Sequence, residues 1–155
     1  MFIGSKYLIM NKFLHKTLPV ANVHGGLLML RVIAAIFIIV HGYPKFLMLF
    51  SGEPVQFADF MGLGPTVSLA LSAFAEFLCA IFVLIGLFTR LAAIPLVINM
   101  SVAVFYAHAN DPFDVKEKAL LFLLIFLFLL LTGAGKYSVD GYLYNSGTPR
   151  ERRYI

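Results

Sequence analysis

Residues 64–90 of the chain read GPTVSLALSAFAEFLCAIFVLIGLFTR, and this stretch decides the fold class. From Thr66 to Phe88 it contains one charged residue, Glu76, in a run that is otherwise uncharged and mostly apolar. A helix needs about 20 mostly apolar residues to cross the hydrocarbon core of a bilayer, and the Gly-Pro pair before the run suits a helix start. The stretch therefore predicts a membrane-spanning helix.

Three further runs share this character, and they lie at about residues 25–44, 91–107 and 116–132. None of the four runs alternates polar and apolar residues, as the strands of a membrane β-barrel do. Gly86, Thr89 and Arg90 mark a very tight turn between the second and third runs, which must therefore be antiparallel neighbours. The sequence predicts an all-α integral membrane protein whose single domain, residues 25–144, is an antiparallel bundle of four transmembrane helices.

The composition supports a surface that faces lipid. Of the 155 residues, 61% are hydrophobic and 13% are charged, and the mean hydropathy is +0.90. A soluble domain carries about 25% charged residues, so we infer that lipid is the solvent of this bundle. The net charge of +4 does not indicate nucleic-acid binding, because the basic residues lie in the tails and between the apolar runs. The single cysteine, Cys79, excludes an intramolecular disulfide and a CxxC redox pair.

Three segments outside the helices are too polar or too short to cross a membrane. Residues 1–24 are expected to be a retained cytoplasmic segment, because their apolar run is too short for the core of a signal peptide. Part of this segment could lie on the membrane surface. Residues 46–63, with Glu53 and Asp59, are expected to cap the bundle at the membrane interface, and residues 145–155 form a polar, basic tail.

Basic residues are unevenly divided between the two ends of the predicted bundle. Three fall at one end, namely Lys45, Lys116 and Lys118. Eight fall at the other end: Lys6, Lys12, Lys16, Arg90, Lys136, Arg150, Arg152 and Arg153. Because cytoplasmic loops of membrane proteins are enriched in Lys and Arg, we expect a multi-pass protein of the bacterial inner membrane with both termini in the cytoplasm.

Two ionisable residues lie deep within the predicted helices. Glu76 falls near the middle of the second helix, and Arg31 falls within the first. A charged side chain inside a membrane is costly and therefore needs a partner or a function. We expect an Arg31–Glu76 ion pair, which either fastens two helices together or takes part in handling a proton or a ligand.

A second group of ionisable residues lies toward the outer end of the predicted bundle. His41 and Lys45 end the first helix, His108 ends the third and Glu117 begins the fourth. These four could converge at an outer mouth with Glu76 below them, or they could be separate interfacial residues that reach for water. They form neither an HExxH motif nor paired ExxH motifs, so no metal site is predicted.

A series of short motifs follows these polar residues along the chain: His41-Gly42 with Lys45-Phe46, Glu76 followed by Gly86-Leu87-Phe88-Thr89-Arg90, His108, Glu117 with Ala119-Leu120, and Gly133 to Asp140, which reads GAGKYSVD. Their order over about residues 28–140 resembles that of the DoxX family of small four-helix membrane proteins. Ala134 stands where the closing motif of the family more often has proline, and Lys136 stands where arginine is usual.

The resemblance implies a four-helix membrane fold and, more loosely, a function. Some DoxX members resemble membrane subunits of quinone-linked sulfur oxidation, and others are associated with membrane complexes that handle oxidative or thiol stress. The first hypothesis is therefore an inner-membrane subunit of such a redox system, rather than a self-sufficient enzyme. Quinone is its candidate cofactor, and the residues expected to contact quinone or carry protons are His41, Lys45, Glu76, His108 and Glu117.

Two other functions stay open. The chain could be a non-catalytic scaffold that recruits a partner, or a small-solute or proton transporter that would have to oligomerise. No nucleotide, flavin or iron–sulfur motif is present, so any electrons would come from another membrane or soluble redox protein or from bound quinone. The lipid bilayer is the expected partner in every case, and a homo-oligomer is left open.

Overall fold

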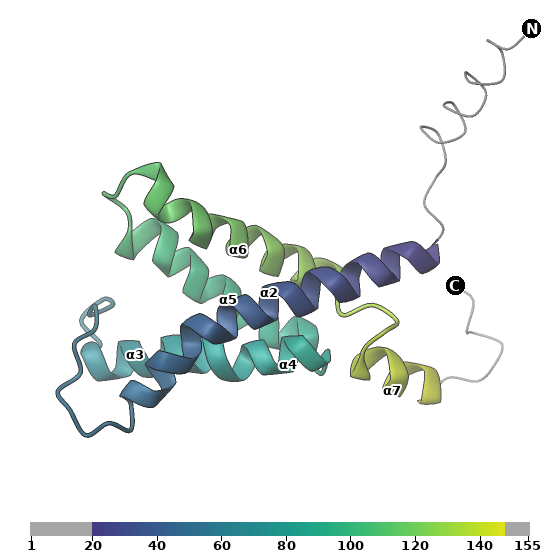
Figure 1. Cartoon of the computed structure of the whole chain (residues 1–155), viewed down its shortest axis with the longest axis horizontal. Coiled ribbons are helices and arrows are strands. Elements are labelled where there is room, and N and C mark those ends of the chain that lie inside the picture. Colours follow the sequence, from purple (N-terminus) through teal and green to yellow (C-terminus); the bar gives the residue numbers. More distant parts are fainter. Residues whose placement is uncertain (1–19, 148–155) are drawn as a thin grey trace, which may run out of the picture.

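The structure is a computed structural model that describes residues 20–147, and every regular element in that range is helical (Figure 1). The elements follow in the order α2 (Val20–Met48), α3 (Pro65–Ala73), the π-helix η1 (Phe74–Cys79), α4 (Ala80–Ile85), α5 (Thr89–Val102), the π-helix η2 (Ala103–Ala107), α6 (Phe113–Thr132) and α7 (Val139–Gly147). The predicted all-α class is confirmed. The predicted surface segment at 1–24 and the tail at 145–155 fall almost wholly outside the described residues.

Three helices in the described range are long and apolar enough to cross a membrane, and they are Asn22–Met48, Pro65–Ile85 and Thr89–Ala107. They cover the first three predicted spans. The fourth predicted span coincides with α6, whose first turns carry Asp114, Lys116, Glu117 and Lys118, so that its uncharged part is confined to Ala119–Thr132.

The helices pack in two pairs that cross. α5 packs most extensively against α6, and Figure 1 shows these two helices running side by side. α2 packs against α3, η1 and α4 in turn, and η1 and α4 also contact α5. The first helix extends beyond its predicted end because Pro44 stays inside it. Pro44 lacks one backbone donor but does not stop the helix, as is common in membrane-spanning helices.

The interior combines several alanines with larger apolar side chains, and the exterior presents many large apolar side chains. Ala35, Ala80 and Ala93 are fully buried, whereas Phe105 is 70% exposed and Leu131 is 75% exposed. Small residues let helix backbones approach closely in a membrane. An exterior of this kind suits lipid rather than water. Both the core and the surface are therefore those of a membrane protein.

The segment between α2 and α3 folds over one end of the bundle. The Phe60 N–H donates to the Ser68 hydroxyl oxygen at 2.9 Å, and the Phe60 ring meets the Tyr106 ring edge-on with centroids 5.1 Å apart. The Met61 N–H donates to the Tyr106 hydroxyl oxygen at 3.5 Å. These contacts tie the segment to α3 and η2, so that it covers the end where α2 stops and α3 starts.

Candidate functional site

An ion pair joins α2 to η1 inside the bundle. The Lys45 Nζ lies 2.6 Å from Oε1 and 2.7 Å from Oε2 of Glu76. The Glu76 side chain is 5% exposed and the Lys45 side chain is 28% exposed. Each charge therefore neutralises the other where water is scarce, which offsets much of the desolvation cost that a lone charge would meet.

Two uncharged side chains complete this network. The Lys45 ammonium donates to the Ser72 hydroxyl oxygen at 3.1 Å. The Ser72 hydroxyl in turn donates to Oε1 of Glu76 at 3.4 Å. The Asn99 amide donates to the same Oε1 at 2.8 Å. All three Lys45 hydrogens thus have acceptors. Side chains from α2, α3, η1 and α5 meet in this network, which we call the polar cluster: Lys45, Ser72, Glu76 and Asn99.

Sequence reasoning missed Ser72 and Asn99 as site residues. Ser72 precedes Glu76 by four residues, so the helical period already placed both on one face. Asn99 is the one amide side chain in the apolar run 91–107, and a polar residue within a span faces the protein interior as a rule. These two signals were sufficient to nominate both residues.

Gly42 explains why the two helices come close enough for the pair to form. A Cβ atom at Gly42 would lie 2.5 Å from the carbonyl carbon of Glu76 and 2.7 Å from the Phe77 nitrogen. Lys45 follows Gly42 by one helical turn and therefore projects from the same face of α2. Next to this contact the rings of Phe46 and Phe77 stack with centroids 4.7 Å apart, which adds an apolar wall beside the ion pair.

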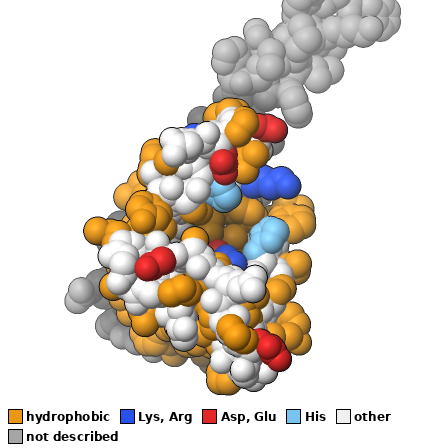
Figure 2. All heavy atoms as spheres, turned by 90° about the vertical axis from the view of Figure 1, so that its left-hand side faces the viewer, with side chains coloured by type: hydrophobic (Ala, Val, Ile, Leu, Met, Phe, Trp, Pro, Cys, Tyr) orange, Lys and Arg blue, Asp and Glu red, His pale blue; other side chains and the backbone are white. Residues whose placement is uncertain are grey.

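The Lys45 side chain of the polar cluster is 28% exposed, and the end of the molecule where α2 stops is hollowed. Figure 2 looks onto the end where α2 stops and shows a hollow with basic and acidic atoms at its floor and histidine atoms at its edge. The Phe57 ring, from the segment between α2 and α3, lies 5.7 Å from the Lys45 Nζ. This distance is within the range of a cation–π contact. The lysine is therefore held between the deep carboxylate and an aromatic ring of the covering segment.

The other predicted members of the outer mouth do not join the polar cluster. The Nδ1 atom of His108 lies 2.7 Å from a carboxylate oxygen of Asp111, in an exposed local pair. His41 and Glu117 are exposed, and neither side chain forms a hydrogen bond or ion pair with another residue in the range 20–147. Of the five candidates, the structure brings together Lys45 and Glu76.

The predicted Arg31–Glu76 ion pair is wrong. The buried Arg31 guanidinium donates to the carbonyl oxygens of Ala134 at 3.2 Å and Tyr137 at 3.0 Å, beyond the end of α6. Arg31 precedes Lys45 by 14 positions, which is about 21 Å along a helix. It therefore serves the opposite end of the bundle, and the flexible Lys45 reaches down to the level of Glu76 instead.

That opposite end is held together by a second set of polar contacts. The Asp140 carboxylate accepts hydrogen bonds from the backbone N–H groups of Phe88 at 2.8 Å and Thr89 at 2.9 Å. It thereby satisfies donors at the start of α5 that have no partner within the helix. The Asp140 N–H in turn donates to the Gly86 carbonyl oxygen at 2.8 Å. These bonds fasten the chain after α6 to the turn between α4 and α5, and Arg31 fastens it to α2.

Within residues 20–147, no three His, Cys, Asp or Glu side chains are grouped so that they could hold a metal ion. The polar cluster offers other chemistry. Lys45 and Asn99 are donors that suit a carbonyl oxygen, and Glu76 is an acceptor that suits a hydroxyl group or a transferred proton.

Comparisons with known proteins agree with this architecture. Residues 26–109 match the family model described as DoxX, and this range contains the whole polar cluster. A protein of Haemophilus influenzae described as an uncharacterized protein is 33% identical over 118 residues, which cover 72% of this chain and 85% of that protein. No solved structure matches the chain.

Proposed function

The chain belongs to the DoxX family of membrane proteins, and from this premise we propose that it binds a quinone and serves as a membrane subunit of a redox system. The observation that carries the proposal is the polar cluster itself, in which Lys45, Glu76 and Asn99 meet inside an otherwise apolar bundle. A quinone needs donors for its two carbonyl oxygens, and a quinol needs acceptors for its two hydroxyl groups. Lys45 and Glu76 supply one of each at adjacent positions.

The redox step requires partners for electrons and protons. Reduction of a quinone to a quinol takes up two electrons and two protons. The electrons come from another membrane or soluble redox protein, which the proposal makes the partner of this chain. A quinone bound at the polar cluster would exchange one proton with the Glu76 carboxylate and the other with water, and Lys45 lies against that carboxylate when the site is empty.

The proposal includes four membrane crossings in the bacterial inner membrane. α6 has 20 residues, which correspond to about 30 Å and match the hydrocarbon thickness. Its charged first turns then lie at the membrane boundary, where Lys side chains extend toward water. The excess of Lys and Arg at the other end supports a cytoplasmic location for both termini. The hollow consequently opens on the outer face.

Titration of the purified protein with a quinone tests the proposal. We expect saturable binding of a ubiquinone analogue by the wild-type protein, and binding weaker by at least about tenfold in Glu76→Gln. The matched control is Glu117→Gln, which removes an exposed carboxylate outside the polar cluster and should leave the affinity unchanged. Absence of saturable binding, or equal binding by Glu76→Gln, would overturn the proposal.

One observation favours a second function. Every donor of the Lys45 ammonium and both oxygens of the Glu76 carboxylate already have partners within the protein. The polar cluster would then only fasten helices, and the protein would act as a scaffold for a partner. A partner that co-purifies with both the wild-type protein and Glu76→Gln, together with no quinone binding, identifies the scaffold.

A further inference from the structure

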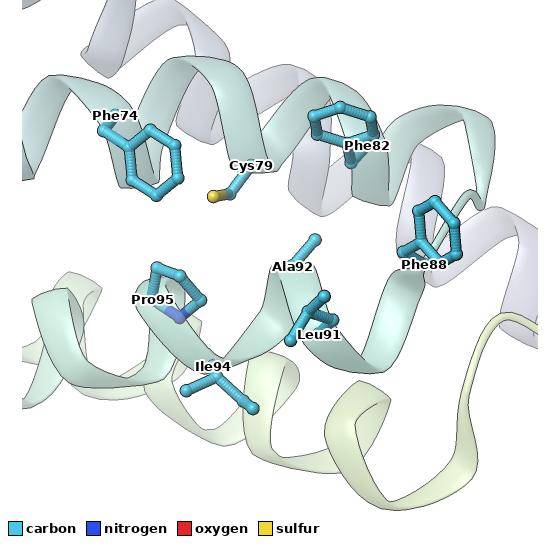
Figure 3. A pocket seen from close by; sticks show the side chains of 8 residues that line it. All are labelled: Phe74, Cys79, Phe82, Phe88, Leu91, Ala92, Ile94 and Pro95. Atoms are coloured by element: carbon cyan, nitrogen blue, oxygen red, sulfur yellow. The ribbon is translucent and has the colours of Figure 1, made fainter.

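A pocket of about 370 Å³ opens on the side of the bundle between the second and third spans (Figure 3). One wall consists of Phe74, Cys79 and Phe82, and the facing wall includes Ala92 and Pro95 of α5. Its lining is almost wholly apolar. The volume lies within the range of small-molecule sites, roughly 300–1,000 Å³, so the pocket suits a hydrocarbon group of a ligand.

The pocket adjoins the polar cluster along the same two helical segments. Cys79 lies one turn beyond Glu76, and Pro95 lies one turn before Asn99. Glu76 and Asn99 are themselves joined by a 2.8 Å hydrogen bond. The polar cluster and the pocket are therefore neighbouring layers between η1–α4 and α5. A molecule with its polar head at the cluster can lay an apolar chain along the pocket.

The depth of the pocket fits a chain that is buried in the membrane. It extends from Phe74 toward the α4–α5 turn, where Phe88 forms its end. The helix from Phe74 to Ile85 rises about 17 Å at 1.5 Å per residue, or about half of the 30 Å hydrocarbon core. Hydrocarbon is the surrounding solvent along this whole length.

We propose that the pocket holds the first isoprenoid units of the tail of the quinone whose ring lies at the polar cluster; this inference rests on the proposed function. A phospholipid acyl chain has similar hydrocarbon chemistry, but its head group stays at the bilayer surface. A phospholipid bound in this way would make no contact with the polar cluster, which adjoins the pocket near the middle of the membrane. A small polar head followed directly by a long apolar tail matches both features.

The single cysteine provides a reporter in the wild-type protein. Cys79 lines the pocket, and the chain has no other thiol, so the rate of its alkylation by N-ethylmaleimide measures access to the pocket. We compare ubiquinone with two isoprenoid units to duroquinone, which has a fully methylated ring and no tail. At ten times its dissociation constant the tailed quinone should slow alkylation about tenfold. Duroquinone should leave the rate unchanged.

Filling the pocket provides the second measurement. Ala92→Phe should weaken binding of the tailed quinone by about tenfold and leave duroquinone binding unchanged, because the ring site is untouched. Ile98→Phe, an exposed position of α5 outside the lining, is the matched control. If Ala92→Phe does not fold, Phe82→Ala removes part of a wall at a half-exposed position and should also weaken only the tailed quinone.

The outcomes separate the two proposals. Saturable binding of both quinones without protection of Cys79 overturns the tail site and leaves the proposed function standing. Binding of neither quinone overturns both. Equal protection of Cys79 by quinone-free phosphatidylethanolamine vesicles assigns the pocket to acyl chains and overturns the tail site. Protection by the tailed quinone alone, lost in the pocket variant, supports it.

Discussion

Gly42 of α2 lies directly against the backbone of Glu76 in η1, with room for no more than a hydrogen atom between them. Helices in membranes approach this closely where one of them presents a small residue. The approach places the Lys45 ammonium 2.6 Å from the carboxylate of Glu76. One glycine thus determines whether the charge of a deep carboxylate is compensated.

Replacing this glycine should disturb the ion pair without changing any polar group. Gly42→Ala forces α2 and η1 apart, and we expect the free energy of unfolding to fall by about 1–3 kcal/mol, as for overpacked cores. Unfolding in detergent by heat or denaturant measures the change. Gly25→Ala is the control, because a Cβ there meets nothing within 4 Å. Equal stability of Gly42→Ala and the wild type would contradict the close approach.

The two charges of the pair should be energetically coupled. Lys45→Met leaves the Glu76 carboxylate uncompensated, so the double variant Lys45→Met/Glu76→Gln should be more stable than the sum of the single effects by about 1–3 kcal/mol. A double-mutant cycle on unfolding free energies measures this coupling. The exposed pair of His108 and Asp111 is the control, with a coupling of at most about 1 kcal/mol. Additive effects at Lys45 and Glu76 would argue against a buried pair.

Asp140 should stabilise the start of a helix that is remote in sequence. Its two carboxylate oxygens accept the N–H groups of Phe88 and Thr89, so Asp140→Ala should lower the free energy of unfolding by about 0.5–2 kcal/mol, as for loss of a helix cap. The same change should speed proteolysis of the chain after α6. Asp114→Ala, at an exposed carboxylate in the first turn of α6, should change both measurements much less.

The contribution of Arg31 to stability should depend on the two separate donor nitrogens of its guanidinium group and not merely on its charge. Two different nitrogens of the guanidinium reach the Ala134 and Tyr137 carbonyls, and a lysine ammonium cannot span both positions in this way. Arg31→Lys should therefore cost about 1–3 kcal/mol of stability. Arg90→Lys, at an exposed arginine with one bond to the Leu131 carbonyl, serves as the comparison. An Arg31→Lys protein as stable as Arg90→Lys would show that charge alone suffices.

The helices could be predicted because long uncharged runs have few alternatives in a membrane. The partner of Glu76 could not, since the helical period of α2 places Arg31 and Lys45 on similar faces but says nothing about depth. The position of each residue along the bundle axis selects its partner. Arg31 lies at the level of Ala134, and the Lys45 side chain extends inward to Glu76. The outer mouth was not correctly predicted because an exposed residue at a helix end, such as His108, can pair locally with a neighbour such as Asp111 and needs no common partner.

The contacts within the polar cluster also could not be predicted from the sequence. Asn99 was visible as a polar residue in an apolar run, but its bond to Glu76 requires that the register of α5 against η1 be known. The π-helical turn that contains Glu76 changes this register. No single residue type predicts such a turn.

The depth of Glu76 has an electrical consequence. Glu76 lies 11 residues from the start of α3 at Pro65, about 16 Å along the helix axis. A proton that reaches the carboxylate from the hollow therefore crosses about half of the membrane voltage, which is worth roughly 1 kcal/mol per 100 mV. With the bacterial orientation proposed above, the interior-negative potential draws protons inward toward Glu76. In that orientation, any movement of charge between the hollow and Glu76 would be coupled to the voltage across the membrane.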